Sequence, residues 1–305
     1  MNRLWRLCER VGVAQTLRKA YFTLHGVPRG WRYRSRVGDL TADFRTTTWY
    51  EFKRARGFYG ETPVLESFVS NLRTDDVVWD VGANVGLYAC FAAKKLETGM
   101  VVGFEPIPRN RRRLVENLRA NAPPWLWRAS PHPLSDSNGP SEMAFDHDAS
   151  MRTLTGAGHH YLTDDDGWID VECRRGDHLV ADGLPAPDVL KIDVQGAELN
   201  VLRGLGDSLD DVRVLYVEIH QEKSRRYDTT PEDLERFLRE AGFSLSSFGP
   251  PRSYRHGVYH VLARRPESLT DPAPSEWTRS DQGVGRPATA EPRIDVASGT
   301  ADGAG

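Results

Sequence analysis

Residues 77–87 have the sequence Val-Val-Trp-Asp-Val-Gly-Ala-Asn-Val-Gly-Leu, which predicts a buried strand, a glycine turn and the start of a helix. A turn of this kind lies at the carboxyl end of its strand, where doubly wound α/β sheets bind their ligands. Gly82 permits the turn and a close backbone approach, and Gly86 lets the following helix pack tightly on the strand. This stretch therefore predicts both the fold class and the position of a ligand pocket.

Two acidic residues at neighbouring strand ends indicate the kind of ligand. The glycines follow G-x-x-x-G, whereas dinucleotide sites carry G-x-G-x-x-G and hold a pyrophosphate on a helix N-terminus. Asp80 would repel a pyrophosphate but suits a positively charged amine or sulfonium. Glu105 lies 19 residues after Gly86 (105 − 86) and can accept both hydrogen bonds of a ribose diol. The alternative is that each acid merely ends its strand. We favour a positively charged nucleoside and rank a nicotinamide-dependent oxidoreductase low.

Strands and helices alternate over most of the chain, which is typical of a parallel sheet covered by helices on both faces. Apolar runs predict one core strand beginning near residue 126 and further strands at 77–79, 100–104, 189–192, 212–219 and 259–263. Helical periodicity predicts helices at 87–96, 109–120, 197–203 and 231–240. We therefore predict an α/β fold with a doubly wound, mostly parallel, Rossmann-like sheet of seven strands, the last of them antiparallel.

The two ends and one insertion interrupt this alternation. Residues 62–265 form the predicted main domain, and we expect a helix to start there with Thr62 as its cap and Pro63 in its first turn. Within it, residues 135–176 are polar and rich in glycine, and the period-two alternation at 168–173 predicts inserted antiparallel strands. Residues 266–305 are rich in Pro, Ala, Ser and Gly and are predicted to be a disordered tail.

The N-terminal extension, residues 1–61, combines a basic amphipathic helix at 1–24 with a β-hairpin at 31–44. For the helix we weigh peripheral contact with a membrane surface against packing on its own domain or on a second subunit of a homodimer. We favour packing, which is the commoner use of such a helix.

Composition narrows the partners and the compartment. The formal net charge is −3, so no overall positive field attracts a nucleic acid. The cysteines Cys8, Cys90 and Cys173 are scattered and odd in number, so neither a disulfide framework nor a thiolate zinc site is predicted. Without an apolar run long enough to span a bilayer and without a signal-peptide pattern, we expect a cytoplasmic protein.

Two later strands carry charged residues near their carboxyl ends, at the same edge of the sheet as the glycine turn. Side chains alternate along a strand, so Lys191 and Asp193 share one face, as do Glu218 and His220 on the next strand. Burying such charges is costly unless they have partners. These residues are either buried structural ion pairs or catalytic groups, and the sequence leaves both interpretations open. After the third core strand, Ser135 and Asp136 can reach an adenine edge, although turn formation explains them equally well.

Five short motifs occur in one order: residues 79–86 (Trp-Asp-Val-Gly-Ala-Asn-Val-Gly), 103–106 (Gly-Phe-Glu-Pro), 134–136 (Leu-Ser-Asp), 191–198 (Lys-Ile-Asp-Val-Gln-Gly-Ala-Glu) and 217–220 (Val-Glu-Ile-His). In this order they resemble the FkbM family of methyltransferases over residues 62–265. The resemblance implies S-adenosyl-L-methionine as methyl donor and a hydroxyl, commonly on a sugar or a polyketide-type natural product, as acceptor. Gln195 departs from the family, which often carries Glu there, so a role that needs a carboxylate at this position does not transfer.

Residues and resemblance together predict an S-adenosylmethionine-dependent methyltransferase that acts on a small-molecule or glycan hydroxyl. The methyl donor is expected to bind to Asp80, Gly82, Ala83, Asn84, Gly86, Glu105, Pro106, Ser135 and Asp136. We expect His220 or Asp193 to be the general base, with Glu218 and Lys191 orienting the acceptor or tuning the base. Carboxylates at adjacent strand ends can also hold Mg²⁺, which the sequence leaves undecided. A catalytically silent binding module with the same fold is the rival function.

Overall fold

The computed structural model describes residues 20–24, 26–57, 60–145, 151–154, 167–248 and 257–266. All described elements belong to one compact unit. Most of the predicted basic helix at 1–24 lies outside the described residues, although residues 20–24 are helical. Parts of the predicted insertion and the predicted tail beyond residue 266 also lie outside them. No helix among the described residues is long and apolar enough to cross a bilayer.

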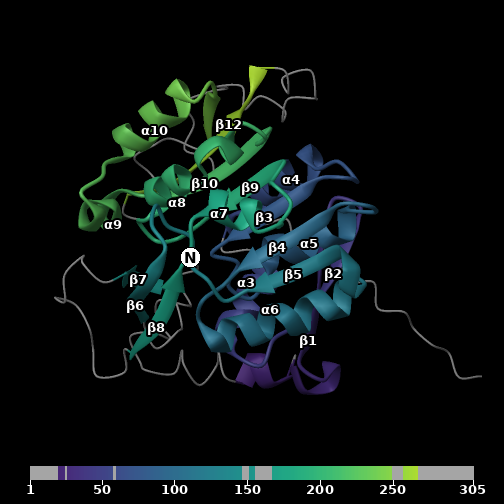
Figure 1. Cartoon of the computed structure of the whole chain (residues 1–305). Coiled ribbons are helices and arrows are strands. Elements are labelled where there is room, and N and C mark those ends of the chain that lie inside the picture. The colour runs from purple at the N-terminus through teal and green to yellow at the C-terminus, as the bar shows by residue number, and fades with distance from the viewer. Residues whose placement is uncertain are drawn as a thin grey trace, which may run out of the picture. The chain divides into compact units, whose positions relative to one another are not determined.

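The central sheet has seven strands in the order β11-β12-β10-β9-β3-β4-β5 (Figure 1). Strands β10, β9, β3, β4 and β5 pair in parallel, and β12 is antiparallel to both β10 and β11. This confirms the predicted doubly wound, mostly parallel sheet with an antiparallel last strand. The strands are β3 (Val77–Val81), β4 (Met100–Phe104), β5 (Trp127–Ser130), β9 (Val189–Ile192), β10 (Val214–His220), β11 (Ser244–Phe248) and β12 (Val258–Arg264). The edge strand β11 has no counterpart among the predicted ranges because three of its five residues are serines.

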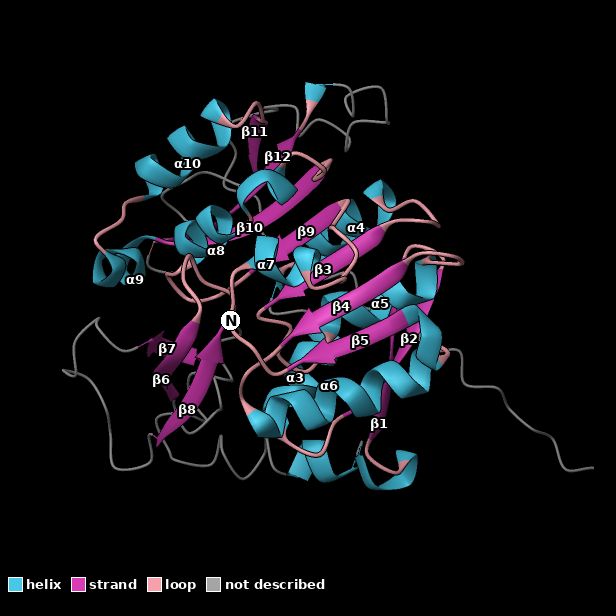
Figure 2. Cartoon of the chain, in the orientation of Figure 1, coloured by secondary structure: helices cyan, strands magenta, loops and turns pink. Residues whose placement is uncertain are grey.

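Helices cover both faces of the sheet (Figure 2). On one face α4, α5 and α6 pack with Val214 and Tyr216 of β10, and on the other α8 and α10 pack with Leu215 and Val217. Alternate residues of β10 therefore face opposite layers, as a strand buried on both sides requires. The helices are α4 (Thr62–Asn71), α5 (Leu87–Lys95), α6 (Pro108–Asn121), α7 (Gly176–Ala181), α8 (Glu198–Gly204), α9 (Gln221–Ser224), α10 (Pro231–Glu240), and the 3₁₀ turns η1 (Val27–Arg29), η3 (Pro124–Leu126), η4 (Gly206–Leu209) and η5 (Arg225–Tyr227).

The start of α4 corrects one prediction. Glu61 occupies the N-cap position and Thr62 is the first helical residue, so the expectation that Thr62 caps the helix is wrong. Pro63 still lies in the first turn, where its missing N–H costs nothing. The shift by one residue turns Glu61 away from the solvent, and its side chain is buried.

The N-terminal extension packs on the same face as α5 and α6. A hairpin is present where it was predicted, formed by β1 (Arg32–Val37) and β2 (Leu40–Arg45), and it turns at Gly38 and Asp39. The outer edge of β2 is paired by side chains instead of a strand: the amides of Asp43 and Arg45 donate to Asn121 and Asn117 of α6, at 2.8 Å each. A helix that the sequence did not predict, α3 (Trp49–Gly57), follows the hairpin.

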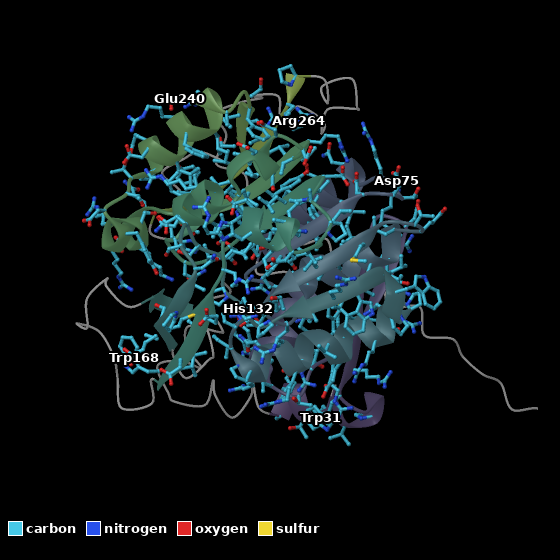
Figure 3. All side chains as sticks on the ribbon, viewed as in Figure 1. Trp31, Asp75, His132, Trp168, Glu240 and Arg264 are labelled. Carbon is cyan, nitrogen blue, oxygen red and sulfur yellow. The ribbon has the colours of Figure 1, made fainter. Side chains whose placement is uncertain are left out.

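The predicted inserted antiparallel strands are present, and they form a separate three-stranded sheet in the order β7-β6-β8, which the sequence did not predict. Its strands are β6 (Gly139–Phe145), β7 (Met151–Leu154) and β8 (Gly167–Cys173). The loop after β5 is tied to β8 by His132, whose Nδ1 lies 2.9 Å from the carbonyl oxygen of Glu172 (Figure 3).

Candidate active site

A cavity opens at the carboxyl ends of β3, β4 and β9, where the chain switches from one half of the sheet to the other. This is the place where doubly wound sheets bind ligands. Residues from five segments line it: Tyr50, Arg54, Val81, Gly82, Asn84, Phe104, Glu105, Pro106, Ile107, Asn110, Pro133, Leu134, Asp193, Val194 and Gln195. Of the predicted site residues, this set includes Gly82, Asn84, Glu105, Pro106 and Asp193.

The glycine turn joins the three strand ends. Gly82 has φ +82°, and a Cβ built there would lie 2.0 Å from the carbonyl oxygen of Asp193. Only glycine therefore lets the β3 turn touch the turn after β9. Gly86 has φ +89°, and its Cβ would lie 2.7 Å from Leu114 Cδ1 of α6. Gly86 thus serves close packing against α6, where the sequence suggested packing against its own strand.

Glu105 is held by backbone donors at the end of β4. Its Oε2 accepts the N–H of Asn84 and its Oε1 that of Ile107, both at 2.8 Å. The side chain is buried, and this burial raises the pKa of Glu105 to about 7 in spite of the two amides. Each oxygen keeps a second lone pair beside the cavity. Ionised Glu105 can therefore accept the two hydrogen bonds of a diol.

Several predicted methyl-donor residues lie beside the cavity and do not line it. Asp80 is 3% exposed, and its Oδ2 accepts the N–H of Ala89 at 3.0 Å. Burial raises its pKa to about 6. Asp80 therefore supports the start of α5, and its role as a negative charge for the methyl donor stays a prediction. Gly86, Ala83, Ser135 and Asp136 are also absent from the lining, where Pro133 and Leu134 present apolar surface instead.

Asp193 and His220 meet through Gln195. The Nε2 of Gln195 lies 2.7 Å from Asp193 Oδ1 and 2.9 Å from His220 Nε2, and Lys223 donates to the Oε1 of the same amide. An amide nitrogen only donates, so in the neutral form of the ring His220 Nε2 accepts and the ring hydrogen lies on Nδ1. His220 is buried and does not line the cavity, whereas Asp193 does. Gln195 thus separates the histidine from the cavity.

Glu198 orients His220 from behind. Its Oε1 lies 3.0 Å from His220 Nδ1 and also accepts the N–H of Gly196 at 2.9 Å. Burial acts to lower the pKa of His220, but Glu198 outweighs it and the pKa is raised. Glu198 itself is 1% exposed. The pair therefore resembles the carboxylate–histidine arrangement that fixes a tautomer in many active sites.

Asp193 and Glu218 form a carboxyl pair with unequal protonation. Burial acts to raise the pKa of Asp193, but Lys191, His220 and Arg54 outweigh it and the pKa is lowered. Burial and the charge of Asp193 raise the pKa of Glu218 to about 8. At neutral pH Asp193 is therefore ionised while Glu218 is mostly protonated.

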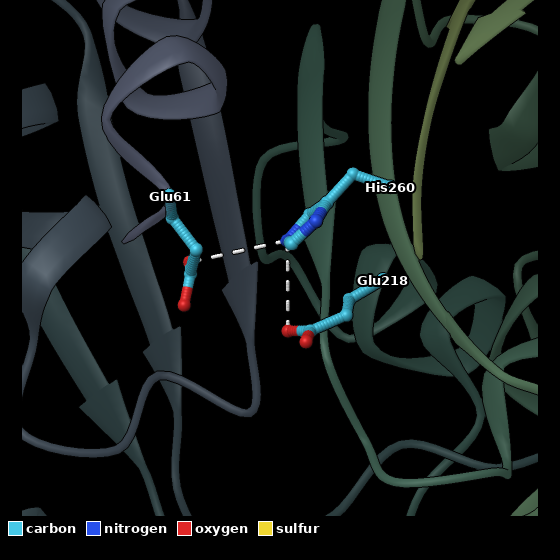
Figure 4. Close-up of side chains that lie close together, drawn as sticks. All are labelled: Glu61, Glu218 and His260. Atoms are coloured by element: carbon cyan, nitrogen blue, oxygen red, sulfur yellow. Dashed lines mark ion pairs between the residues drawn. The ribbon is translucent and has the colours of Figure 1, made fainter. Parts of the chain in front are cut away.

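Glu218 also contacts a second group behind the site. His260 Nε2 lies 3.6 Å from Glu218 Oε2 and 3.9 Å from Glu61 Oε2 (Figure 4). Burial and the neighbouring Lys191 lower the pKa of His260 to about 3, so the imidazole in these contacts is neutral. Glu61 in turn accepts the hydroxyl of Tyr88 at 2.9 Å. The charged residues near the strand ends thus continue into a polar layer under the N-terminal extension.

The sequence did not predict Tyr50, Arg54 and Glu198, among other residues of this site, as site residues. Glu198 had a signal, because it lies two residues after Gly196 in one of the motifs and begins a helix. The positions of Tyr50 and Arg54 had none, since α3 reaches the cavity only through packing between distant segments. The ion pair of Glu51 Oε1 with Arg113 Nε, at 2.7 Å, is one such contact.

A doubly wound sheet whose switch point holds a glycine turn and a carboxylate at the next strand end is typical of a Rossmann-like domain that binds a nucleoside. Residues 80–245 match the model of the methyltransferase FkbM domain. The chain belongs to this family, and it is a methyltransferase.

Named relatives agree with this assignment. The chain is 32% identical over 209 residues to the hexuronic acid methyltransferase AglP of Haloferax volcanii. This alignment covers 68% of this chain and 80% of that protein. It is 29% identical to the 31-O-demethyl-FK506 methyltransferase FkbM of Streptomyces tacrolimicus, over 64% of this chain and 82% of that protein. It is also 32% identical to the 2-O-methyltransferase NoeI of Sinorhizobium fredii, over 48% of this chain and 64% of that protein.

The family implies S-adenosylmethionine, and the polar groups of the cavity fit it. Glu105 offers acceptors for the ribose diol, and Arg54 offers a positive charge for the carboxylate. Asn84 Oδ1 is buried beside the cavity and has no hydrogen-bond partner within the described part of the chain. A buried acceptor of this kind suits a ligand that brings a donor, such as an ammonium group.

Proposed function

We propose that this enzyme transfers the methyl group of S-adenosylmethionine to a hydroxyl group of a sugar, glycan or natural-product acceptor. One observation carries the proposal: Glu105 and Asp193 line a single cavity from two strand ends, with the glycine turn between them. Relatives named for 31-O-demethyl-FK506 and for 2-O-methylation support a hydroxyl acceptor, and the relative named for a hexuronic acid supports a sugar.

Glu105 and the glycine turn bind and orient the methyl donor. S-adenosylmethionine, when bound, supplies a methyl group on a positively charged sulfur, which keeps the C–S bonding pair as a thioether. The protein therefore needs mainly to hold the reacting oxygen in line with that methyl group. The rigid turn at Gly82, fixed against the carbonyl of Asp193, keeps the two halves of the cavity in register.

Asp193 accepts the hydroxyl proton as the C–O bond forms. It is ionised, it lines the cavity, and it receives an N–H from Gln195. His220 lies behind Gln195, so we assign it a supporting role: it holds the side chain of Gln195 in place and influences the pKa of Asp193. Lys191, by its charge, and Glu218, by a side-chain hydrogen bond, both act to lower the pKa of Asp193. Of the two candidate bases suggested by the sequence, the geometry thus favours Asp193.

A Mg²⁺-assisted route makes a different prediction. Asp193, Glu218 and His220 each offer a ligand atom, and these atoms lie within 4.8 Å of one another. However, Gln195 already donates to Asp193 and His220, and Lys191 and Arg54 supply positive charge to the same carboxylates. We therefore expect EDTA to leave the rate unchanged, whereas a Mg²⁺ route requires a loss of activity that Mg²⁺ restores.

The direct test uses S-adenosylmethionine with a labelled methyl group and a panel of oligosaccharides that end in glucuronate, galacturonate or glucose. We expect label in a product that survives alkali, because methyl ethers resist the hydrolysis that releases methanol from methyl esters. Alkali-labile label on the uronates would place the methyl on a carboxylate and contradict a hydroxyl acceptor. Failure of the enzyme to bind S-adenosylhomocysteine in calorimetry would contradict the proposal as a whole.

A further inference from the structure

The cavity has one positively charged wall that comes from outside the family-matched region 80–245. Arg54 of α3 forms it and is 8% exposed. Tyr50, one helical turn earlier, accepts a hydrogen bond from Asn84 Nδ2 at 3.2 Å. This bond ties α3 to the glycine turn. Tyr50 and Arg54 both line the cavity, so the same bond holds α3 at the cavity.

The charge on Arg54 is fixed by its surroundings. Burial acts to lower the pKa of Arg54, but Tyr50, Glu61, Asp193 and Glu218 outweigh it and the pKa is raised. The guanidinium therefore keeps its positive charge at every accessible pH. Glu218 is mostly protonated at neutral pH, so it offsets little of that charge.

The backbone that carries Arg54 is rigid. Ser35 Oγ of β1 donates to the carbonyl of Ala55 at 2.5 Å, and Arg113 of α6 pairs with Glu51 at the start of α3. A buried guanidinium on a fixed backbone has little conformational entropy to lose when it binds. Its planar fork matches the two oxygens of a carboxylate.

We propose that Arg54 binds a carboxylate in the cavity, and that this group is the α-carboxylate of the methyl donor. The inference rests on the proposed function, because it assumes that S-adenosylmethionine is the ligand. That molecule has one anionic group, its α-carboxylate, at the end opposite the adenine. Glu105 and Arg54 line this one cavity, where Glu105 suits the diol and Arg54 suits the α-carboxylate. A uronic acid acceptor offers the same chemistry, but the link from Tyr50 to the glycine turn favours the methyl donor.

The test compares two ligands that differ only in the carboxylate. S-adenosylhomocysteine and 5′-deoxy-5′-(3-aminopropyl)thioadenosine share the nucleoside and the amine, and calorimetry gives both affinities for the full chain. We expect the unmodified enzyme to prefer S-adenosylhomocysteine by about 10- to 100-fold, as one charge-assisted bidentate contact provides. Arg54→Met should abolish this preference by weakening S-adenosylhomocysteine alone, and Arg54→Lys should retain part of it.

Two controls separate binding from folding. Arg56→Met changes an exposed arginine of the same helix and should keep the full preference. An unchanged affinity of Arg54→Met for the aminopropyl analogue shows that the cavity is intact. If Arg54→Met does not fold, the unmodified enzyme and Arg54→Lys still give the comparison, because equal preferences in these two would overturn the inference.

The remaining outcomes are equally distinct. Equal affinity of the unmodified enzyme for both nucleosides would overturn the inference without any variant, while leaving the proposed function standing. Absence of binding by either nucleoside would instead remove the proposed function. A further titration tests whether the carboxylate belongs to a uronic acid acceptor. The enzyme is first saturated with S-adenosylhomocysteine, and glucuronate or glucose is then added. A preference for glucuronate that Arg54→Met erases would assign Arg54 to the acceptor and overturn its assignment to the methyl donor.

Discussion

The two sides of the cavity are built in different ways. On the glycine-turn side, residues 82–84 and 105–107 hold Glu105 with backbone amides from adjacent strand ends. On the Asp193 side, each position depends on another side chain: Lys223 fixes Gln195, which contacts Asp193 and His220, and Glu198 holds the ring. A backbone cradle tolerates little change in the ligand, whereas a side-chain network can be retuned. Substitutions on the first side should therefore change methyl-donor affinity, and those on the second should change rate.

The largest expected effect is on the Asp193 side. Asp193→Asn keeps the shape but removes the ionised group that takes the hydroxyl proton, so kcat should fall by about 10²- to 10⁴-fold. Affinity for S-adenosylhomocysteine should change little. The measurement is methyl transfer at saturating methyl donor, with exposed Asp211→Asn as the matched control. An unchanged kcat would remove Asp193 as the base and erase the contrast between the two sides.

Glu105→Gln should produce the opposite pattern. The amide has one acceptor oxygen, and its NH₂ would face a backbone N–H of Asn84 or Ile107. We expect affinity for S-adenosylhomocysteine to fall by about 10- to 100-fold, because a charge-assisted contact to the diol is lost. The rate at saturating methyl donor should be largely kept. Glu97→Gln, at an exposed position, is the control. If calorimetry gives Glu105→Gln the same affinity for S-adenosylhomocysteine as the unmodified enzyme, the role of the carboxylate is contradicted.

The same carboxylate predicts how binding depends on pH. The pKa of Glu105 is raised to about 7, and only the ionised form accepts both hydroxyls of the diol. Affinity for S-adenosylhomocysteine should therefore be full above pH 7 and fall as pH drops, by at most about tenfold per unit. Glu105→Gln should remove this dependence. A decline that persists in the variant would assign the titration to another group.

The two sides of the cavity also differ in how well the sequence predicts them. The glycine turn, Glu105 and their strands lie in short continuous motifs with their own periodicity and turn chemistry, so their places at the sheet edge could be predicted. Arg54 could not, because α3 is positioned by a hairpin and by contacts such as that of Glu51 with Arg113. The partner of a side chain was also beyond prediction: the sequence placed Asp80 at a strand end but gave no sign of its hydrogen bond from the N–H of Ala89. Strand-end position is visible in a sequence, whereas the partner of a buried charge is not.

A smaller effect on the rate is expected from Glu198, which contacts Asp193 neither directly nor through Gln195 but holds the ring of His220. Glu198→Gln removes the charge that raises the pKa of His220, so this pKa should fall, and kcat should drop by about three- to tenfold. The ring titration can be followed by NMR, with the signal assigned through His220→Asn. Glu222→Gln, on the exposed surface nearby, should leave both quantities unchanged. A rate loss without a shift in the pKa of His220 would indicate a purely structural role.

The smallest effect at neutral pH is expected from Glu218→Gln, although Glu218 belongs to the same carboxyl pair as Asp193. The pKa of Glu218 is raised to about 8, so at pH 7 the amide replaces a group that already carries a proton, and kcat should change by less than about twofold.

The difference should emerge in stability as pH rises. A carboxyl group whose pKa is higher in the folded than in the unfolded protein binds more protons when folded, so its contribution to the free energy of unfolding decreases with rising pH between the unfolded value and about 8. Glu218→Gln removes this decrease. The melting temperature of Glu218→Gln relative to that of the unmodified enzyme should therefore increase with pH up to about pH 8. Above pH 8 this difference should remain constant at its higher value. A constant difference between pH 5 and pH 9 would mean that Glu218 is ionised throughout, and the inequality within the pair, on which the assignment of Asp193 as the base depends, would be lost.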